Sequence, residues 1–157
     1  MNRTTKLAAI CASLLLAAFV APVAAQSMKS VAGTYSVVKI PAYGENARGR
    51  LVLGADGRYS LIAGRTTLPK FAANSRVKGT PEENKAVIDG SIAHFGTYTV
   101  DDGGKAITFN IQMSTFPNWD GTSAKRALKV AGDQLTYTVT APSAGGPPND
   151  VIWKRVK

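Results

Sequence analysis

The polar side chains best suited to chemistry are grouped at the start of one β-like segment. They are Glu45, Asn46, Arg48 and Arg50. A carboxylate with two guanidinium groups could hold the polar or anionic head of a small molecule, because arginine presents a planar fork of donors. Alternatively, Glu45 pairs with Arg48 at the surface and stabilises a loop by less than about 1 kcal/mol. Alternation places Arg48 and Arg50 on the strand face opposite Leu51, so an inward arginine would need a partner or water.

A tight loop carries the second candidate binding element, Asn118 and Trp119, between Pro117 and Gly121. An exposed tryptophan in such a loop would anchor a ligand, since its large ring is apolar and its N–H is a donor. The alternative is that Trp119 packs over the end of the fold while Asn118 caps backbone groups. Both interpretations place this loop at one end of the fold.

The single histidine, His94, lies between a predicted helix and a predicted strand, where it could act as a general base. A lone histidine is otherwise a structural residue. Common hydrolase and nucleotide-binding patterns are absent from the sequence. The Asp- and Gly-rich segment 101–104 lacks the ligand spacing of a calcium loop and predicts a hairpin turn. We therefore expect no metal or cofactor and assign no catalytic residue.

The elements that would position these residues are strands, because apolar and polar residues alternate with a period of two along most of the chain. Turns containing glycine and aspartate separate the segments, as at 54–57 and 132–133. The predicted strands are 33–40, 48–53, 58–62, 95–100, 106–114, 124–131, 134–140 and 151–156. Eight strands in a short chain avoid open edges by closing, so we predict an all-β, eight-stranded antiparallel up-and-down barrel.

One long segment, 63–79, interrupts this series of strands and is followed by a helix start signal. Thr80 and Glu83 have capping-box spacing, and Pro81 occupies the first helical position. We predict one short helix between the third and fourth strands. Long connections of this kind often border binding sites, so this one is expected to cross one mouth of the barrel. Alternatively, the helix only plugs the barrel end.

The first 25 residues have the pattern of a secretory signal peptide, which leaves residues 26–157 as one barrel domain. Positive residues precede an apolar run, and small residues precede the expected cleavage before Gln26. The only cysteine, Cys11, would leave with this peptide, so no disulfide is expected. No later segment is long and apolar enough to span a membrane. The expected location is the periplasm or the exterior of the cell.

The charge that remains after cleavage is basic. Without Arg3 and Lys6, 17 Lys and Arg residues face 10 Asp and Glu residues, a net charge of +7. The basic residues are scattered, the longest runs being pairs such as Lys125-Arg126, and we interpret them as solvated strand faces. No motif of interleaved basic and aromatic residues is present, so nucleic acid is not an expected partner.

Four segments resemble the bacterial lipocalin-like domain proteins. They are Gly33-Thr34-Tyr35, residues 43–51 with Ala55-Asp56-Gly57, residues 116–122, and residues 151–155. The resemblance implies a barrel that binds small, largely apolar molecules, with enzymes among the broader group. Tyr35 stands where true lipocalins have a tryptophan that packs under a late arginine. Tyr35 and Arg155 are expected to reproduce that contact as a cation over a ring.

Taken together, the sequence predicts an exported barrel that binds a small hydrophobic or amphipathic molecule. The candidate lining residues are Val38, Leu51, Phe109, Ile111, Met113, Leu135 and Tyr137, and the candidate mouth residues are Glu45, Arg48, Arg50, Asn118 and Trp119. Each ligand CH₂ buried there would contribute about 0.8 kcal/mol. The same apolar side chains could instead pack the barrel solid.

Two other functions stay open. One is a barrel isomerase or cyclase in which Glu45 or His94 moves protons and Arg50 stabilises negative charge. The other is an interaction or inhibitor protein that uses residues 63–79 as its contact loop.

Overall fold

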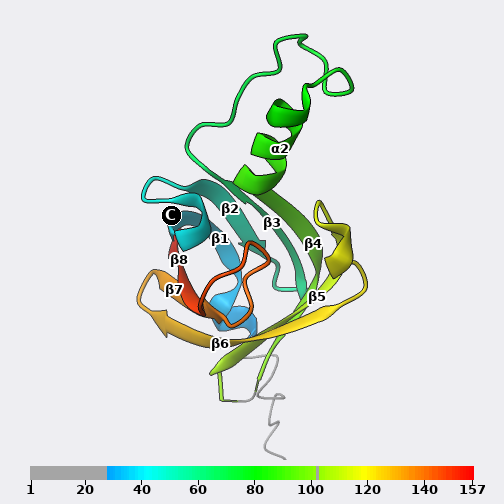
Figure 1. Ribbon diagram of the computed structural model, residues 1–157. Helices are drawn as coiled ribbons and strands as arrows, with labels where there is room; N and C mark the ends of the chain where they lie inside the picture. The colour runs from blue at the N-terminus through cyan, green and yellow to red at the C-terminus, as the bar shows by residue number, and fades with distance from the viewer. Residues whose placement is uncertain (1–27, 102) are drawn as a thin grey trace, which may run out of the picture.

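The computed structural model describes residues 28–101 and 103–157, and the predicted signal peptide at 1–25 lies outside them. The described strands form one closed barrel in which each strand pairs antiparallel with the next and β8 pairs with β1 (Figure 1). The strands are β1 (Gly33–Lys39), β2 (Arg48–Leu53), β3 (Arg58–Gly64), β4 (Ser91–Val100), β5 (Ala106–Ser114), β6 (Ser123–Ala131), β7 (Gln134–Val139) and β8 (Asn149–Arg155). The predicted eight-stranded antiparallel up-and-down barrel is confirmed.

The short helix predicted between the third and fourth strands is α2, Pro81–Gly90. The capping box is present: the Thr80 side chain accepts a hydrogen bond from the Glu83 N–H, and the Glu83 carboxylate accepts one from the Thr80 N–H at 2.9 Å. The other carboxylate oxygen of Glu83 accepts from the Ala72 N–H at 2.8 Å. This single side chain therefore starts the helix and ties the preceding loop to it.

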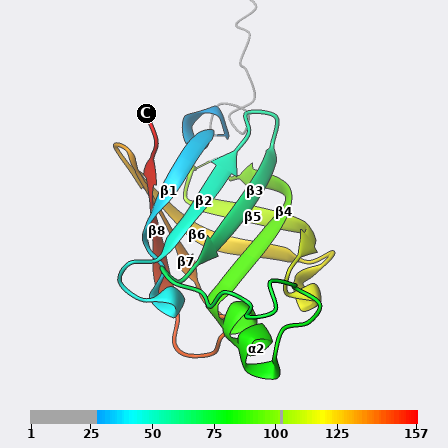
Figure 2. The same ribbon diagram turned by 90° about the horizontal axis from the view of Figure 1, so that it is seen from above.

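Helix α2 and two 3-10 helices gather at the same end of the barrel. The 3-10 helices are η1 (Pro41–Tyr43), which follows β1, and η2 (Pro117–Trp119), which follows β5. Figure 2 shows α2 and the loop between β7 and β8 at the end opposite the C-terminus. The long connection before α2 extends away from the barrel (Figure 1). Among the described residues, no helix is long and apolar enough to cross a membrane.

The opposite end of the barrel is closed by Tyr35 and Arg155. The Arg155 guanidinium lies 4.8 Å from the centre of the Tyr35 ring, so the predicted cation–π contact is confirmed. Arg155 also donates hydrogen bonds to the carbonyl oxygens of Ser30, at 2.9 Å, and Ala32. The Tyr35 hydroxyl donates to the Val31 carbonyl oxygen at 2.6 Å. These contacts hold residues 30–32 across the barrel end, and the apolar side chains around them are packed.

Two residues predicted to face the interior, Val38 and Met113, face outward instead. Tyr35 is buried, so alternation places Val37 inward and leaves Val38 47% exposed. A β-bulge turns Met113 outward. Phe95 pairs with Met113, but the next residue of β4, Gly96, pairs with Ile111, so β5 contains one extra residue between these pairs. Met113 is consequently 57% exposed, and both residues lie on the outer wall of the barrel.

Candidate ligand-binding cavity

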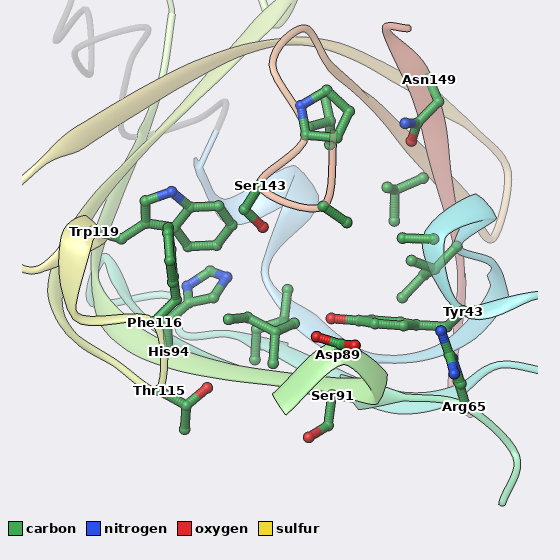
Figure 3. Close-up of a pocket in the computed structure, with 18 of the residues that line it drawn as sticks. Tyr43, Arg65, Asp89, Ser91, His94, Thr115, Phe116, Trp119, Ser143 and Asn149 are labelled. Carbon is green, nitrogen blue, oxygen red and sulfur yellow. The ribbon is translucent and has the colours of Figure 1, made fainter. Parts of the chain in front are cut away.

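A cavity of about 580 Å³ opens at the α2 end of the barrel. Its walls come from the ends of β3, β4, β7 and β8, and its rim from η1, α2, η2 and the loop between β7 and β8 (Figure 3). This volume is within the range typical of small-molecule sites. The barrel is thus packed near its termini and hollow near α2.

The deep part of the cavity contains His94, which is 7% exposed. We expected it just before a strand, but it lies within β4, which begins at Ser91 directly after α2. Its Nδ1 is 2.8 Å from the Tyr59 hydroxyl oxygen. The imidazole ring also meets the rings of Phe109 and Trp119 edge to face, with centroids 6.4 and 5.7 Å apart. His94 is therefore held in one orientation by aromatic neighbours on several sides.

Burial, and secondarily the nearby positive charge of Arg126, lower the pKa of His94 to about 4. The imidazole is consequently neutral near pH 7, with one nitrogen as donor and the other as acceptor. Burial also raises the pKa of Tyr59, so its phenol keeps its proton. A Tyr59 hydroxyl that donates to Nδ1 leaves the proton on Nε2, and His94 is then a hydrogen-bond donor rather than a base.

Arg126 brings a positive charge to the inward face of the barrel. It lies on β6 two residues before buried Leu128, which places it on the inward face of that strand. Its guanidinium carbon lies 5.0 Å from the ring centre of Tyr137 and 5.8 Å from that of Phe109. From the sequence we assigned Arg126 to a solvated strand face, together with the other scattered basic residues. Its spacing from Leu128 was the signal that could have identified it.

Tyr137 and Trp153 form the wall beside Arg126. Burial raises the pKa of the Tyr137 phenol, an effect that the Arg126 charge partly offsets. The Trp153 indole is fully buried, and its ring centre lies 6.5 Å from that of Tyr137. Its Nε1 makes no hydrogen bond of ordinary geometry with any residue that the structure describes. Trp119 also lines the cavity, so both tryptophans of the chain border it.

Polar and charged side chains occupy the rim. The Tyr43 hydroxyl points into the opening in Figure 3, and its pKa is raised to about 12 by burial, with Arg65 opposing the shift. On α2, the Lys85 ammonium lies 2.5 Å from the Asp89 carboxylate. A ligand that enters past α2 therefore meets donors and a paired carboxylate before it reaches the aromatic interior.

A second, smaller hollow of about 290 Å³ lies at the side of the barrel. The ladder between β6 and β7 runs only from Ala131 opposite Gln134 to Leu128 opposite Tyr137, so the first half of β6 pairs with β5 alone. The last residues of β7, which follow Tyr137, therefore have no partner on β6, and the hollow lies beside them. Arg126 lines both spaces, and it therefore stands between the cavity and a lateral opening.

The structure gathers only some of the predicted site residues. Tyr137 and Trp119 line the cavity, and Ile111 lines the lateral hollow with Trp119. Leu51, Phe109 and Leu135 are buried in the core but do not border the cavity, and Val38 and Met113 lie outside the barrel. The predicted mouth residues Glu45, Arg48, Arg50 and Asn118 are exposed and do not border it either.

The polar group that opened the sequence analysis does not form a site around the cavity. Arg48 and Arg50 lie on the outer face of β2, opposite in direction to buried Leu51. No salt bridge joins Glu45 to Arg48 among the described side chains. Neither Glu45 nor Arg50 is brought to His94 at the cavity, so the structure does not assemble the three residues of the isomerase or cyclase hypothesis. Within residues 28–101 and 103–157, no cluster of His, Cys, Asp and Glu is suited to a metal ion.

The sequence model of a family described as "Lipocalin-like domain" matches residues 24–156. A curated relative is the 4'-hydroxy-3'-methoxypropiophenone carrier protein ppsC of Aspergillus oryzae (strain ATCC 42149 / RIB 40). The two chains are 28% identical over 80 residues, which cover 47% of this chain and 72% of the relative.

Proposed function

The chain belongs to the lipocalin-like domain family, and on this premise we propose that it is an exported carrier of a small hydrophobic or amphipathic molecule. The molecule binds in the cavity at the α2 end. The observation that carries the proposal is this cavity of about 580 Å³, in which aromatic walls lie beside polar and charged side chains. Burial of apolar ligand surface supplies the affinity, and the inward polar groups orient the ligand.

The character of the walls favours a molecule with an aromatic ring. Phe116 and Trp119 meet edge to face at 5.7 Å on one side, and Trp119 also contacts His94. Rings held at such angles leave edges and faces for a ligand ring to contact. The similarity to a protein named as the carrier of a small aromatic ketone supports the same ligand class.

Export is the second part of the proposal, and the signal-peptide pattern of residues 1–25 supports it. Fractionation of the native host followed by intact-mass measurement tests it. We expect a periplasmic or secreted protein that begins at Gln26. An unprocessed chain in the cytoplasm would contradict this part.

Intrinsic tryptophan fluorescence tests ligand binding directly, because both tryptophans border the cavity. Titration with N-phenyl-1-naphthylamine, a neutral aromatic probe, and with 4'-hydroxy-3'-methoxypropiophenone should change the emission in a saturable way. Val139, at the end of β7, lines the cavity, so Val139→Phe should narrow it and weaken binding at least tenfold. Val38→Phe adds the same side chain on the outer wall and should leave binding within twofold. Equal effects of both variants, or no saturation with either probe, would contradict the carrier function.

A further inference from the structure

We propose that the molecule bound in the cavity is an organic anion, whose carboxylate or comparable charged group pairs with Arg126. This inference rests on the proposed function and specifies the chemical class of its ligand. Arginine pairs with such groups through two parallel N–H donors, which fixes the orientation of the anion as well as its charge.

The first argument is the position of Arg126. Its side chain is half-buried, it lines both the cavity and the lateral hollow, and its guanidinium lies against the rings of Tyr137 and Phe109. A cation withdrawn from water is costly unless a partner compensates it. The two ring contacts offset only part of that cost.

The second argument is that Arg126 has no anionic partner in the part of the chain that the structure describes. None of the salt bridges there involves it, and no described oxygen accepts a hydrogen bond from its guanidinium. The acidic residue that lines the cavity is Asp89 at the rim, and its carboxylate is already engaged by Lys85. Within the described residues, Arg126 therefore presents to the cavity a positive charge that has no anionic partner and that a ligand can neutralise.

The third argument is the character of the other polar groups near Arg126. Its charge lowers the pKa values of Tyr59, His94 and Tyr137, and of these the Tyr137 ring lies 5.0 Å from its guanidinium carbon. All three are neutral near pH 7, and the Tyr137 hydroxyl is a hydrogen-bond donor on the same wall as Arg126. A set of donors around one cation complements an anion better than it complements a neutral group or a second cation.

Two fluorescent probes of similar aromatic size separate this inference from the proposed function. N-phenyl-1-naphthylamine is neutral, and 1-anilinonaphthalene-8-sulfonate carries one negative charge. With Arg126→Gln, we expect the affinity for the anionic probe to fall at least tenfold and the affinity for the neutral probe to change less than twofold. Arg126→Lys keeps the charge but loses the planar fork, and it should give an intermediate loss for the anionic probe.

The matched control is Arg50→Gln, which removes the same charge from the exposed outer face of β2. It should leave both affinities within twofold. If Arg126→Gln lowers the affinity for both probes equally, Arg126 only shapes the cavity. If Arg126→Gln and Arg50→Gln lower the affinity for the anionic probe equally, the probe is attracted by surface charge. Either result overturns the inference. Unchanged binding of the anionic probe in Arg126→Gln also overturns it. If the wild-type protein binds only the neutral probe, the inference of an anionic ligand is wrong but the carrier function stands. If it binds neither probe, the carrier function is wrong as well.

Discussion

The hydroxyl oxygen of Tyr59 lies 2.8 Å from Nδ1 of His94, and both side chains are buried. Tyr59 of β3 pairs with Gly96 of β4, and His94 lies two residues before Gly96 on the same strand. The side chains of Tyr59 and His94 therefore project from the same inward face of the sheet. Each residue satisfies a polar group that the other would otherwise bury unpaired. The pair therefore fixes the floor of the cavity.

Removing both members of this pair should cost less than the sum of the two single removals. Tyr59→Phe leaves Nδ1 of His94 without its partner and should destabilise the fold by about 1–3 kcal/mol. His94→Phe should have a similar cost, because the Tyr59 hydroxyl then loses its acceptor. In the double variant neither polar atom remains, so its loss of stability should be smaller than the sum by about 1 kcal/mol or more. Urea unfolding of the four proteins gives these values, and strict additivity would contradict the coupling.

His94 should also make stability depend on pH. Its pKa is lowered to about 4 in the folded protein and is about 6.5 in the unfolded chain. Between these values the unfolded chain binds the extra proton, so stability is full above about pH 6.5 and is lost as pH falls toward 4. The whole difference corresponds to about 3 kcal/mol.

Unfolding free energies of wild type and His94→Gln at pH 7, 5.5 and 4.5 test this. Carboxylates titrate in both proteins, so the difference between the two curves isolates His94. We expect wild type to lose stability more steeply than the variant. Parallel curves would show that the folded imidazole titrates like an exposed one.

At the closed end of the barrel, Arg155 should contribute far more to stability than an exposed arginine. Arg155→Gln removes the contact with the Tyr35 ring and weakens the hydrogen bonds to residues 30–32, which together predict a loss of about 1–3 kcal/mol. Arg58→Gln is the matched control, because that side chain is 81% exposed and its pair with Asp56 is at the surface. Thermal unfolding should show a change within about 0.5 kcal/mol for the control. Equal effects would contradict the structural role of Arg155.

The sequence was sufficient for the fold because its two main signals are local. Alternation in segments such as 106–114 reports which face is buried, and turn glycines report where the chain reverses. The capping box at Thr80 is likewise local, since both of its hydrogen bonds lie within one helical turn. Even the contact of Tyr35 with Arg155 could be predicted, because the family resemblance supplied the pairing of distant strands.

The site was harder to predict because it depends on where strands begin, bulge and separate. The extra residue in β5 turns Met113 outward, and nothing in the alternation up to Ile111 signals this change. Which strand ends surround the cavity depends on the register of the whole barrel, which the sequence does not show. The group of polar residues near Glu45 was therefore a poor guide to the position of the cavity mouth. Arg126 was missed because a charged pair normally indicates solvent, whereas here one arginine lies inside the barrel against two aromatic rings.

The charge of Arg126 should also change the ionisation of a bound phenol. In 4'-hydroxy-3'-methoxypropiophenone the hydroxyl is para to the ketone, so the phenolate is stabilised by delocalisation and absorbs at longer wavelength than the phenol. Because Arg126 favours the anion, the bound molecule should ionise at a lower pH than the free one, and a tenfold preference for the anion lowers its pKa by one unit, or about 1.4 kcal/mol.

Absorbance titration with excess protein measures this shift; His94 stays neutral above about pH 4 and does not interfere. Arg126→Gln should abolish the shift, and the 3',4'-dimethoxy analogue, which cannot ionise, should show no spectral change. A bound phenol that ionises at or above the pH of the free one would show that burial outweighs the arginine.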